Sequence, residues 1–422
     1  MKHSIIDALR VKPFAYLMSA ELFTQLGSNI FNFYLIFAVF SLTKSNTAVA
    51  AIVLSFTIPA LIFGIPAGVY VDRWDKKWVL FLSNFSRALL LIALAFMHEN
   101  VIAIFFFSFF IAIFAQFFIP AESPLIPTIV SPKLLLSANA LFGLGIYGSM
   151  LIAFILSGPI ILVFGRMQTL LFLAALFFVS CIFLWLIKVP GAKRERRIGN
   201  SQKMTRAMID ELRDVVRLLS NTKEVHHALF LLALSQVLIL LIASLAPGYA
   251  TSVLKVSVEQ FPLLFIAPAA CGVFIGAILV SFLGKVRKDK IITIGLFLSG
   301  IVMVILPYGS KIASRDIIIA LNLYLPHIVE ITTFHLVTVI AFLLGFSNAF
   351  VFVPANTILL ENTSDQIRGK VYGVLNAIVG GFSLLPLVAA GGLSDLFGVT
   401  TVIIGIGVCL FLLGVLRVVF RI

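Results

Sequence analysis

The apolar residues of this chain fall into continuous runs separated by short polar segments. Each run is about 20 residues long, which is the length that an α-helix needs to cross the hydrocarbon core of a bilayer. The strands of a membrane β-barrel are shorter and alternate between apolar and polar residues, so this pattern excludes a barrel. Because 61% of the 422 residues are hydrophobic and only 12% are charged, a water-soluble globular protein and a disordered chain are also excluded. The sequence predicts an all-α membrane protein.

The runs predict twelve membrane-spanning helices. We expect them at about 13–42, 47–70, 78–97, 101–121, 136–163, 168–188, 226–250, 260–282, 290–308, 334–360, 370–391 and 399–420. A single long polar stretch divides them six and six. The sequence therefore predicts an N-terminal six-helix bundle (1–189), a cytoplasmic linker with an amphipathic helix (190–225) and a C-terminal six-helix bundle (226–422). The amphipathic helix either lies on the inner membrane surface or is a solvated linker.

The two halves share a sequence motif, which indicates an internal repeat. The fourth expected span ends with Phe-Ile-Pro-Ala at 118–121, and the tenth contains Phe-Val-Pro-Ala at 352–355. An outer-loop insertion is expected at about 310–333, because its apolar part is too short to span. Two parallel repeats of six helices are one known construction of secondary transporters, which bind substrate between the repeats near the midplane.

The positive charge is distributed unequally between the two sides of the expected helices. With the N-terminus inside, 26 of the 31 Lys and Arg residues lie on the inner side or in spans near it. The positive-inside rule therefore predicts that both termini are cytoplasmic. This asymmetry accounts for the net charge of +13, so we expect no nucleic-acid partner.

A charged motif follows the second expected span. Residues 68–77 read GVYVDRWDKK and closely resemble the G-x-x-x-D-R-x-G-R-K signature of the major facilitator superfamily, with Asp75 where the family usually has Gly. Together with SNFSRAL at 83–89, the motif is similar to the branch that contains macrolide-efflux proteins and the enterobactin exporter. The resemblance covers essentially the whole chain, because the span number, the central linker and the repeat also fit. It implies a transporter that works by alternating access.

The resemblance also implies an inner gate. Its residues would be Gly68, Asp72, Arg73, Lys76 and Lys77. By analogy with the family, Asp72 meets the N-terminal end of the eleventh span near Gly369 and Gly373, where the helix dipole favours an anion. Charges at a membrane surface can hold two bundles together in one state and release them in another. The alternative is that these charges only anchor the protein at the cytoplasmic surface.

The first expected span carries a polar stripe. Its members, Glu21, Gln25, Asn29 and Asn32, fall within an arc of about 80° on one helix face. A polar stripe in lipid faces the protein interior or a water-filled cavity. Because this span lines the cavity in the family, the resemblance implies that the stripe contacts substrate, whereas the alternative is helix packing. Further cavity candidates, each of which also fits a packing role, are Gln116, Gln236 and Asn348.

Glu21 is the one acidic residue well inside an expected span, which makes it a candidate for proton coupling. Burial favours the neutral form of a carboxyl group, and this suits a group that gains and loses a proton in each cycle. The alternative is a structural ion pair with Arg87, which lies at a matching depth, although Arg87 could instead extend toward the cytoplasm. We expect Glu122, at the inner end of the fourth span, to be an interfacial cap or the partner of a basic loop residue.

No phosphate-binding loop, metal-ligand spacing or nucleophilic constellation is present in the sequence, so we expect no enzyme activity, no cofactor and no metal. The sequence predicts a monomeric multi-pass transporter of the cell (inner) membrane. It would export a hydrophobic or amphipathic small molecule in exchange for protons. One alternative is an uptake or lipid transporter of the same fold, for example for lysophospholipids. Another is a membrane sensor that no longer transports, although a sensor needs neither the Asp72 loop nor a buried Glu21.

Overall fold

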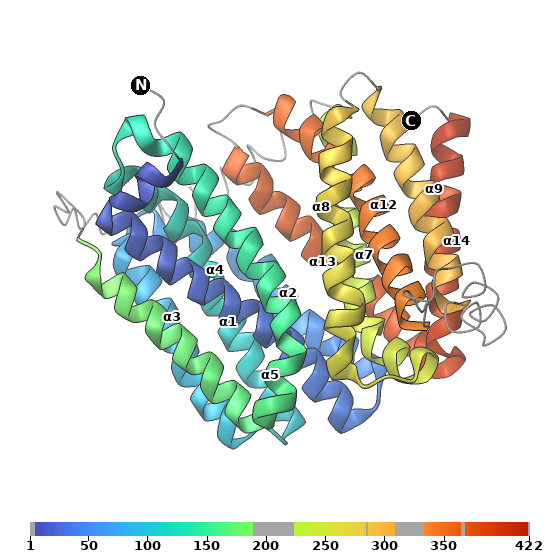
Figure 1. Ribbon diagram of the computed structural model, residues 1–422, viewed down its shortest axis with the longest axis horizontal. Coiled ribbons are helices and arrows are strands. Elements are labelled where there is room, and N and C mark those ends of the chain that lie inside the picture. The colour runs from blue at the N-terminus through green and yellow to red at the C-terminus, as the bar shows by residue number, and fades with distance from the viewer. Residues whose placement is uncertain (1–4, 189–222, 284–285, 309–332, 364–367, 421–422) are drawn as a thin grey trace, which may run out of the picture. The chain divides into compact units, whose positions relative to one another are not determined.

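The computed structural model describes residues 5–188, 223–283, 286–308, 333–363 and 368–420 (Figure 1). The ordered elements of this part of the chain are all helices, and no strand occurs among them. The predicted linker (190–225) and outer-loop insertion (about 310–333) lie outside the described residues, apart from their last positions. The prediction of an all-α multi-pass protein is confirmed.

The first of two compact units comprises Met1–Leu42 and Ile52–Val216. Its helices are α1 (Lys12–Thr43), α2 (Asn46–Val71), α3 (Lys76–Phe96), α4 (Val101–Ile129) and α5 (Leu135–Leu186), with short 3₁₀ helices η1 (Ile5–Arg10) and η2 (Pro132–Leu134). Buried residues of α1, α3, α4 and α5 form one apolar core, which includes Leu17, Leu80, Ala121 and Leu184. This core holds together the four helices that carry the polar groups described below.

Helix α5 is 52 residues long and is interrupted at Gly165. At about 1.5 Å per residue it exceeds twice the thickness of a hydrocarbon core of about 30 Å. Gly165 has φ 73° and ψ −179°, a conformation that residues with a Cβ rarely adopt. It lies between the fifth and sixth expected spans, so the glycine allows the backbone to break between two apolar segments.

The second unit comprises Thr43–Ala51 and Arg217–Ile422. Its helices are α7 (Lys223–Gly248), η3 (Tyr249–Leu254), η4 (Val258–Gln260), η5 (Pro262–Ile266), α8 (Ala267–Phe282), α9 (Lys288–Ile305), η6 (Leu306–Tyr308), α12 (Thr333–Glu361), α13 (Arg368–Phe397) and α14 (Val399–Phe420). Helices α8 and α12 approach each other closely at two glycines. A Cβ on Gly345 would lie 1.8 Å from the Ala269 carbonyl oxygen, and one on Gly272 would lie 2.0 Å from that of Phe342. Small residues of this kind allow membrane helices to pack backbone against backbone.

Within the described residues, 11 segments are long and apolar enough to cross a membrane, and the interrupted helix α5 belongs to one of them. Most ends agree with the sequence prediction to within a few residues. The end of the fourth span at 121 was wrong, because α4 continues to Ile129 through Pro124 and Pro127. Prolines are tolerated in membrane helices, where neighbouring groups satisfy the backbone that they release.

The first turn of α2 is capped by Asp395 of α13, and both belong to the second unit. Asp395 Oδ1 accepts hydrogen bonds from the Asn46 backbone N–H at 2.8 Å and from Asn46 Nδ2 at 2.9 Å. Asp395 Oδ2 accepts from Ser45 Oγ at 2.7 Å, from the Thr47 N–H at 3.0 Å and from Thr47 Oγ1 at 2.7 Å. A carboxylate at this position satisfies unpaired N–H groups of the helix and interacts favourably with its dipole.

We predict that Asp395→Ala lowers the free energy of unfolding by about 1–2 kcal/mol, since the helix loses its cap. Thermal unfolding of the detergent-purified protein measures the effect. Asp395→Asn is the matched control, because it keeps one acceptor oxygen and loses the other together with the charge, and its midpoint should lie between those of Asp395→Ala and wild type. Equal midpoints for Asp395→Ala and wild type would show that the cap contributes nothing.

Candidate functional site

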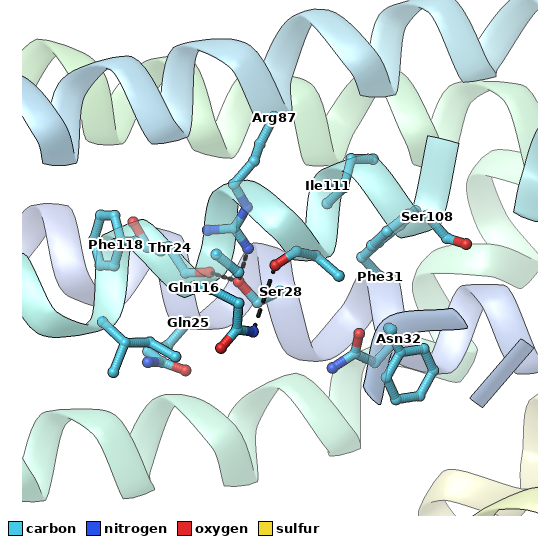
Figure 2. A pocket seen from close by; sticks show the side chains of 14 residues that line it. Thr24, Gln25, Ser28, Phe31, Asn32, Arg87, Ser108, Ile111, Gln116 and Phe118 are labelled. Atoms are coloured by element: carbon cyan, nitrogen blue, oxygen red, sulfur yellow. Dashed lines mark hydrogen bonds between the residues drawn. The ribbon is translucent and has the colours of Figure 1, made fainter. Parts of the chain in front are cut away.

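The first unit contains a cavity of about 210 Å³ between α1, α2, α3 and α4 (Figure 2). Its lining residues are Thr24, Gln25, Ser28, Phe31, Asn32, Phe56, Arg87, Ser108, Ile111, Ala112, Ala115, Gln116, Phe118 and Ile119. Half of these side chains are polar and half are apolar. Among these lining residues Arg87 is the one with a charge, and Figure 2 shows it extending from α3 toward Ser28.

The structure brings several predicted cavity residues together. Gln25 and Asn32 of α1, Gln116 of α4 and Arg87 of α3 all line this cavity. Asn29 lies beside it on the stripe, where its Nδ2 donates to the Gln25 carbonyl oxygen at 2.8 Å and to Gln25 Oε1 at 3.4 Å. The polar stripe of α1 therefore consists of residues that contact the cavity and residues that support them.

Arg87 is buried, with 3% of its surface exposed. Its Nη2 donates to Ser28 Oγ at 2.5 Å and its Nη1 donates to Asn84 Oδ1 at 3.2 Å. The guanidinium carbon lies 4.2 Å from the centroid of the Phe177 ring, which is a cation–π contact. Arg87 Nε has no hydrogen-bond partner among the described residues. Because Arg87 is buried and bonded to Ser28 and Asn84, it does not extend to the cytoplasm. It also forms no salt bridge with Glu21 within the described part of the chain.

Asn84, which accepts a hydrogen bond from Arg87, is part of a buried network. Asn84 Nδ2 donates to Thr24 Oγ1 at 2.7 Å and to Ser180 Oγ at 2.8 Å, and the two hydroxyls are 2.9 Å apart. Ser180 Oγ also donates a hydrogen bond to the Ala20 carbonyl oxygen at 2.9 Å. The network joins α1, α3 and α5 and fixes the Arg87 guanidinium at the cavity wall.

Glu21 is almost fully buried, with 1% of its surface exposed. Its Oε1 accepts a hydrogen bond from Gln25 Nε2 at 2.7 Å, so Glu21 is one residue removed from the cavity. Its carboxyl group also lies beside that of Glu122 on α4, and the Oε2 atoms of both residues are buried without a hydrogen-bond partner among the described residues. The expectation that Glu122 is an interfacial cap or pairs with a basic loop residue was wrong, because Glu122 is only 8% exposed and faces another acid.

The charged motif forms two helix caps. Asp75 Oδ1 accepts from the N–H groups of Lys77 at 3.0 Å and Trp78 at 3.4 Å, so the residue that departs from the family pattern caps the start of α3. Lys77 Nζ donates to the carbonyl oxygens of Trp185 at 2.8 Å and Ile187 at 2.7 Å, at the end of α5. The Asp72 side chain is exposed. The gate assigned to Gly68, Asp72, Arg73, Lys76 and Lys77 stays a prediction.

In the second unit, Asn348 is buried on α12, where its Oδ1 accepts from Ser235 Oγ of α7 at 2.8 Å. This contact packs two helices together. Gln236, the neighbour of Ser235, is half-buried. Neither residue lines the cavity described above, which lies in the first unit. Their role in substrate binding stays a prediction.

We predict that Asn84→Leu lowers the free energy of unfolding by about 3 kcal/mol, because it leaves the Arg87 Nη1, Thr24 and Ser180 groups short of a buried partner. Thermal unfolding in detergent again measures the effect. Asn32→Leu is the control, since it makes the same change at an exposed asparagine of the same unit, which lines the cavity and is not part of the buried network. Similar midpoints for the two variants would show that the network does not stabilise the unit.

The model of the major facilitator superfamily matches residues 17–378 of the chain. The chain belongs to the major facilitator superfamily. The protein is therefore a multi-pass membrane transporter of a small-molecule substrate rather than an enzyme. It is also similar to YfiS of Bacillus subtilis (strain 168), an uncharacterized transporter of the same superfamily, with 23% identity over 171 residues. That alignment spans 40% of each protein, so it covers less than half of YfiS.

Solved transporter structures share the fold. The nucleoside transporter NupG matches with a TM-score of 0.71 at 14% identity, covering 96% of this chain and 98% of that one. A bacterial homologue of the human lysosomal transporter Spinster, in an inward-facing and unoccupied conformation, matches with a TM-score of 0.73 at 13% identity, covering 96% and 95%. A POT family transporter in complex with a peptide conjugate matches with a TM-score of 0.70 at 14% identity, covering 97% and 96%. At these identities the likeness concerns the fold alone.

Proposed function

We propose that the protein is a proton-coupled exporter of a hydrophobic or amphipathic small molecule and works by alternating access. It would belong to the branch of macrolide-efflux proteins and the enterobactin exporter, to which residues 68–77 are similar. We further propose that it has twelve spans in two six-helix bundles (1–189 and 226–422) and that both termini are cytoplasmic. It would be a monomer in the cell (inner) membrane. The count of twelve is supported by the break of α5 at Gly165, which separates two apolar segments.

The composition of the cavity carries this proposal. Apolar side chains such as Phe31, Phe56 and Phe118 offer contact to an apolar body, while Gln25 and Gln116 offer hydrogen bonds. Apolar contact surface combined with fixed polar groups that orient the ligand is typical of small-molecule sites, and here the polar half of the lining is unusually large. Because Arg87 is the charged residue of this lining, a substrate with an acceptor oxygen suits the cavity better than one with a cation beside that wall.

The position of Glu21 supports proton coupling. Glu21 is buried, yet it is connected to the cavity through a single hydrogen bond from Gln25. A change in the protonation of Glu21 alters what Gln25 can donate or accept, and Gln25 is a residue that a substrate in the cavity contacts. This gives proton binding and substrate binding a direct physical link.

The two caps in the charged motif support a gate at Asp72. Asp75 and Lys77 are engaged with helix ends of the first unit, so they fix the path of the loop. The exposed Asp72 carboxylate is then presented at a defined place, as an exposed switching charge requires. Arg73 and Lys76 lie in the same loop and would act with it.

We predict that Asp72→Asn abolishes substrate export, because the neutral amide no longer binds strongly to a helix N-terminus. Accumulation of a fluorescent dye in cells that express the variant measures export. Asp75→Asn is the matched control: it removes a charge from the same loop but leaves an amide oxygen that still caps α3, so export should persist. Export by Asp72→Asn at the wild-type rate would reject the gate.

We predict that Glu21→Gln abolishes export driven by the proton gradient while the protein still reaches the membrane, because glutamine carries no exchangeable acid proton. The measurement compares dye and macrolide accumulation in cells with wild type, Glu21→Gln or no transporter, with and without a protonophore. Wild-type cells should accumulate less until the protonophore is added. If wild type and empty cells accumulate the same amount with every probe, uptake, lipid transport or sensing replaces export.

A further inference from the structure

The five long helices of the first unit, α1 to α5, contain two acidic side chains, and these lie beside each other. Helices α1 to α5 include Glu21 on α1 and Glu122 on α4, and the remaining residues of these five helices include no other Asp or Glu. Both side chains are buried, with 1% and 8% of their surface exposed. Because a buried acid usually pairs with a cation, two acids that face each other need a physical explanation.

The hydrogen bonds of the two carboxyl groups give that explanation. Glu21 Oε1 is occupied by the Gln25 amide at 2.7 Å. The Oε2 atoms of Glu21 and Glu122 are both buried, and neither accepts a hydrogen bond from an N–H or hydroxyl group of the described residues. The two carboxyl groups lie beside each other, and two ionised carboxylates cannot satisfy one another because both only accept hydrogen bonds. One proton between them satisfies both.

The surrounding charges do not remove the need for this proton. Arg87 on α3 is the cation whose charge acts on Glu21, but it forms no salt bridge with Glu21 and donates instead to Ser28 and Asn84. On α5 the thiol of Cys181 interacts with Arg87, and no group of α5 is among those that act on Glu21 or Glu122. Helix α2 contains no Asp, Glu, Lys, Arg or His. A single positive charge therefore faces two acids, and one proton on the pair balances the local charge.

The part of α4 that carries Glu122 is able to change shape. Pro120, Pro124 and Pro127 lie inside this helix and have no N–H group, so three of its backbone hydrogen bonds are missing around Glu122. Bends in helices concentrate at such prolines. A small bend of α4 moves Glu122 relative to Glu21, and separation of the two carboxyl groups removes the reason to hold the proton.

We propose that Glu21 and Glu122 form one proton-binding site, which holds a single shared proton when α1 and α4 are in contact and releases it when they separate. The inference deepens the proposed function and rests on it for the role of that proton in transport. Binding takes one H⁺ from water on one side of the membrane, and the net charge of the pair changes from −2 to −1. Release returns the same H⁺ to water on the other side and restores −2. No other atom or electron is transferred.

Infrared difference spectroscopy of the purified protein, recorded as pH is changed, tests the shared proton without any transport. At neutral pH wild type should show the carbonyl stretch of a protonated carboxyl group. Glu122→Gln should lose this signal, because the amide donates to Glu21 and leaves it ionised, and Glu21→Gln should lose it for the corresponding reason. Glu99→Gln is the control, since Glu99 is exposed in the turn before α4, and it should keep the signal.

Three results would overturn the proposal: no protonated carboxyl in wild type, a signal that survives in Glu122→Gln, or a signal that sodium ions abolish. The last would mean that the two acids bind a metal cation. Export driven by a pH gradient in proteoliposomes then tests coupling, and Glu122→Gln should lose it as Glu21→Gln does. If wild type shows the infrared signal but no pH-driven export, the proposed function fails while the shared site stands.

Discussion

A charge inside the hydrocarbon core of a membrane must find a partner, and this constraint explains most of the polar structure of the first unit. Arg87 donates to Ser28 and Asn84 and lies against the ring of Phe177. Glu21 accepts a hydrogen bond from Gln25 and lies beside Glu122. These contacts join α1, α3 and α4, so the groups that line or adjoin the cavity are also the groups that hold its walls together. Changes at the site are therefore expected to affect stability as well as activity.

The ends of the helices show a related solution. The first N–H groups and the last carbonyls of a helix have no partner within it. In this protein side chains act as hydrogen-bond partners for several of these groups. Asp75 caps α3, Lys77 binds the last carbonyls of α5 and Asp395 caps α2. Two of these three contacts come from distant parts of the sequence, and each ties a helix end to a neighbouring segment. The charged motif thus has a structural role in addition to the gate that we propose for it.

Much of the fold could be predicted from the sequence, because the length of an apolar run is set by the thickness of the bilayer. The polar stripe of α1 could also be found, since its members recur at helical spacing. The partner of Glu21 could not. The expected fourth span ended at residue 121, one residue before Glu122, so Glu122 was expected at the end of the helix rather than inside it. Packing on α1 and α3 keeps α4 helical to Ile129 and places Glu122 inside.

The interaction partners of Arg87 could not be predicted from the sequence either. Equal depth in the membrane made an ion pair with Glu21 a reasonable hypothesis, but depth does not define the direction of a side chain around the helix axis. The Arg87 guanidinium contacts an amide, a hydroxyl and an aromatic ring, while its Nε has no hydrogen-bond partner among the described residues. Serine and threonine hydroxyls such as Thr24, Ser28 and Ser180 attract little notice in an apolar run, although they provide much of the buried network.

The hydrogen bonds from Lys77 to the end of α5 have a mechanical consequence. Trp185 and Ile187, whose carbonyls it binds, are among the last residues of the first unit that the structure describes before the chain continues toward the second. A pull on the chain at that point acts through one ammonium group on the loop that contains Asp72. The end of α5 and the loop that contains Asp72 are therefore linked directly, so a displacement of one is transmitted to the other through Lys77.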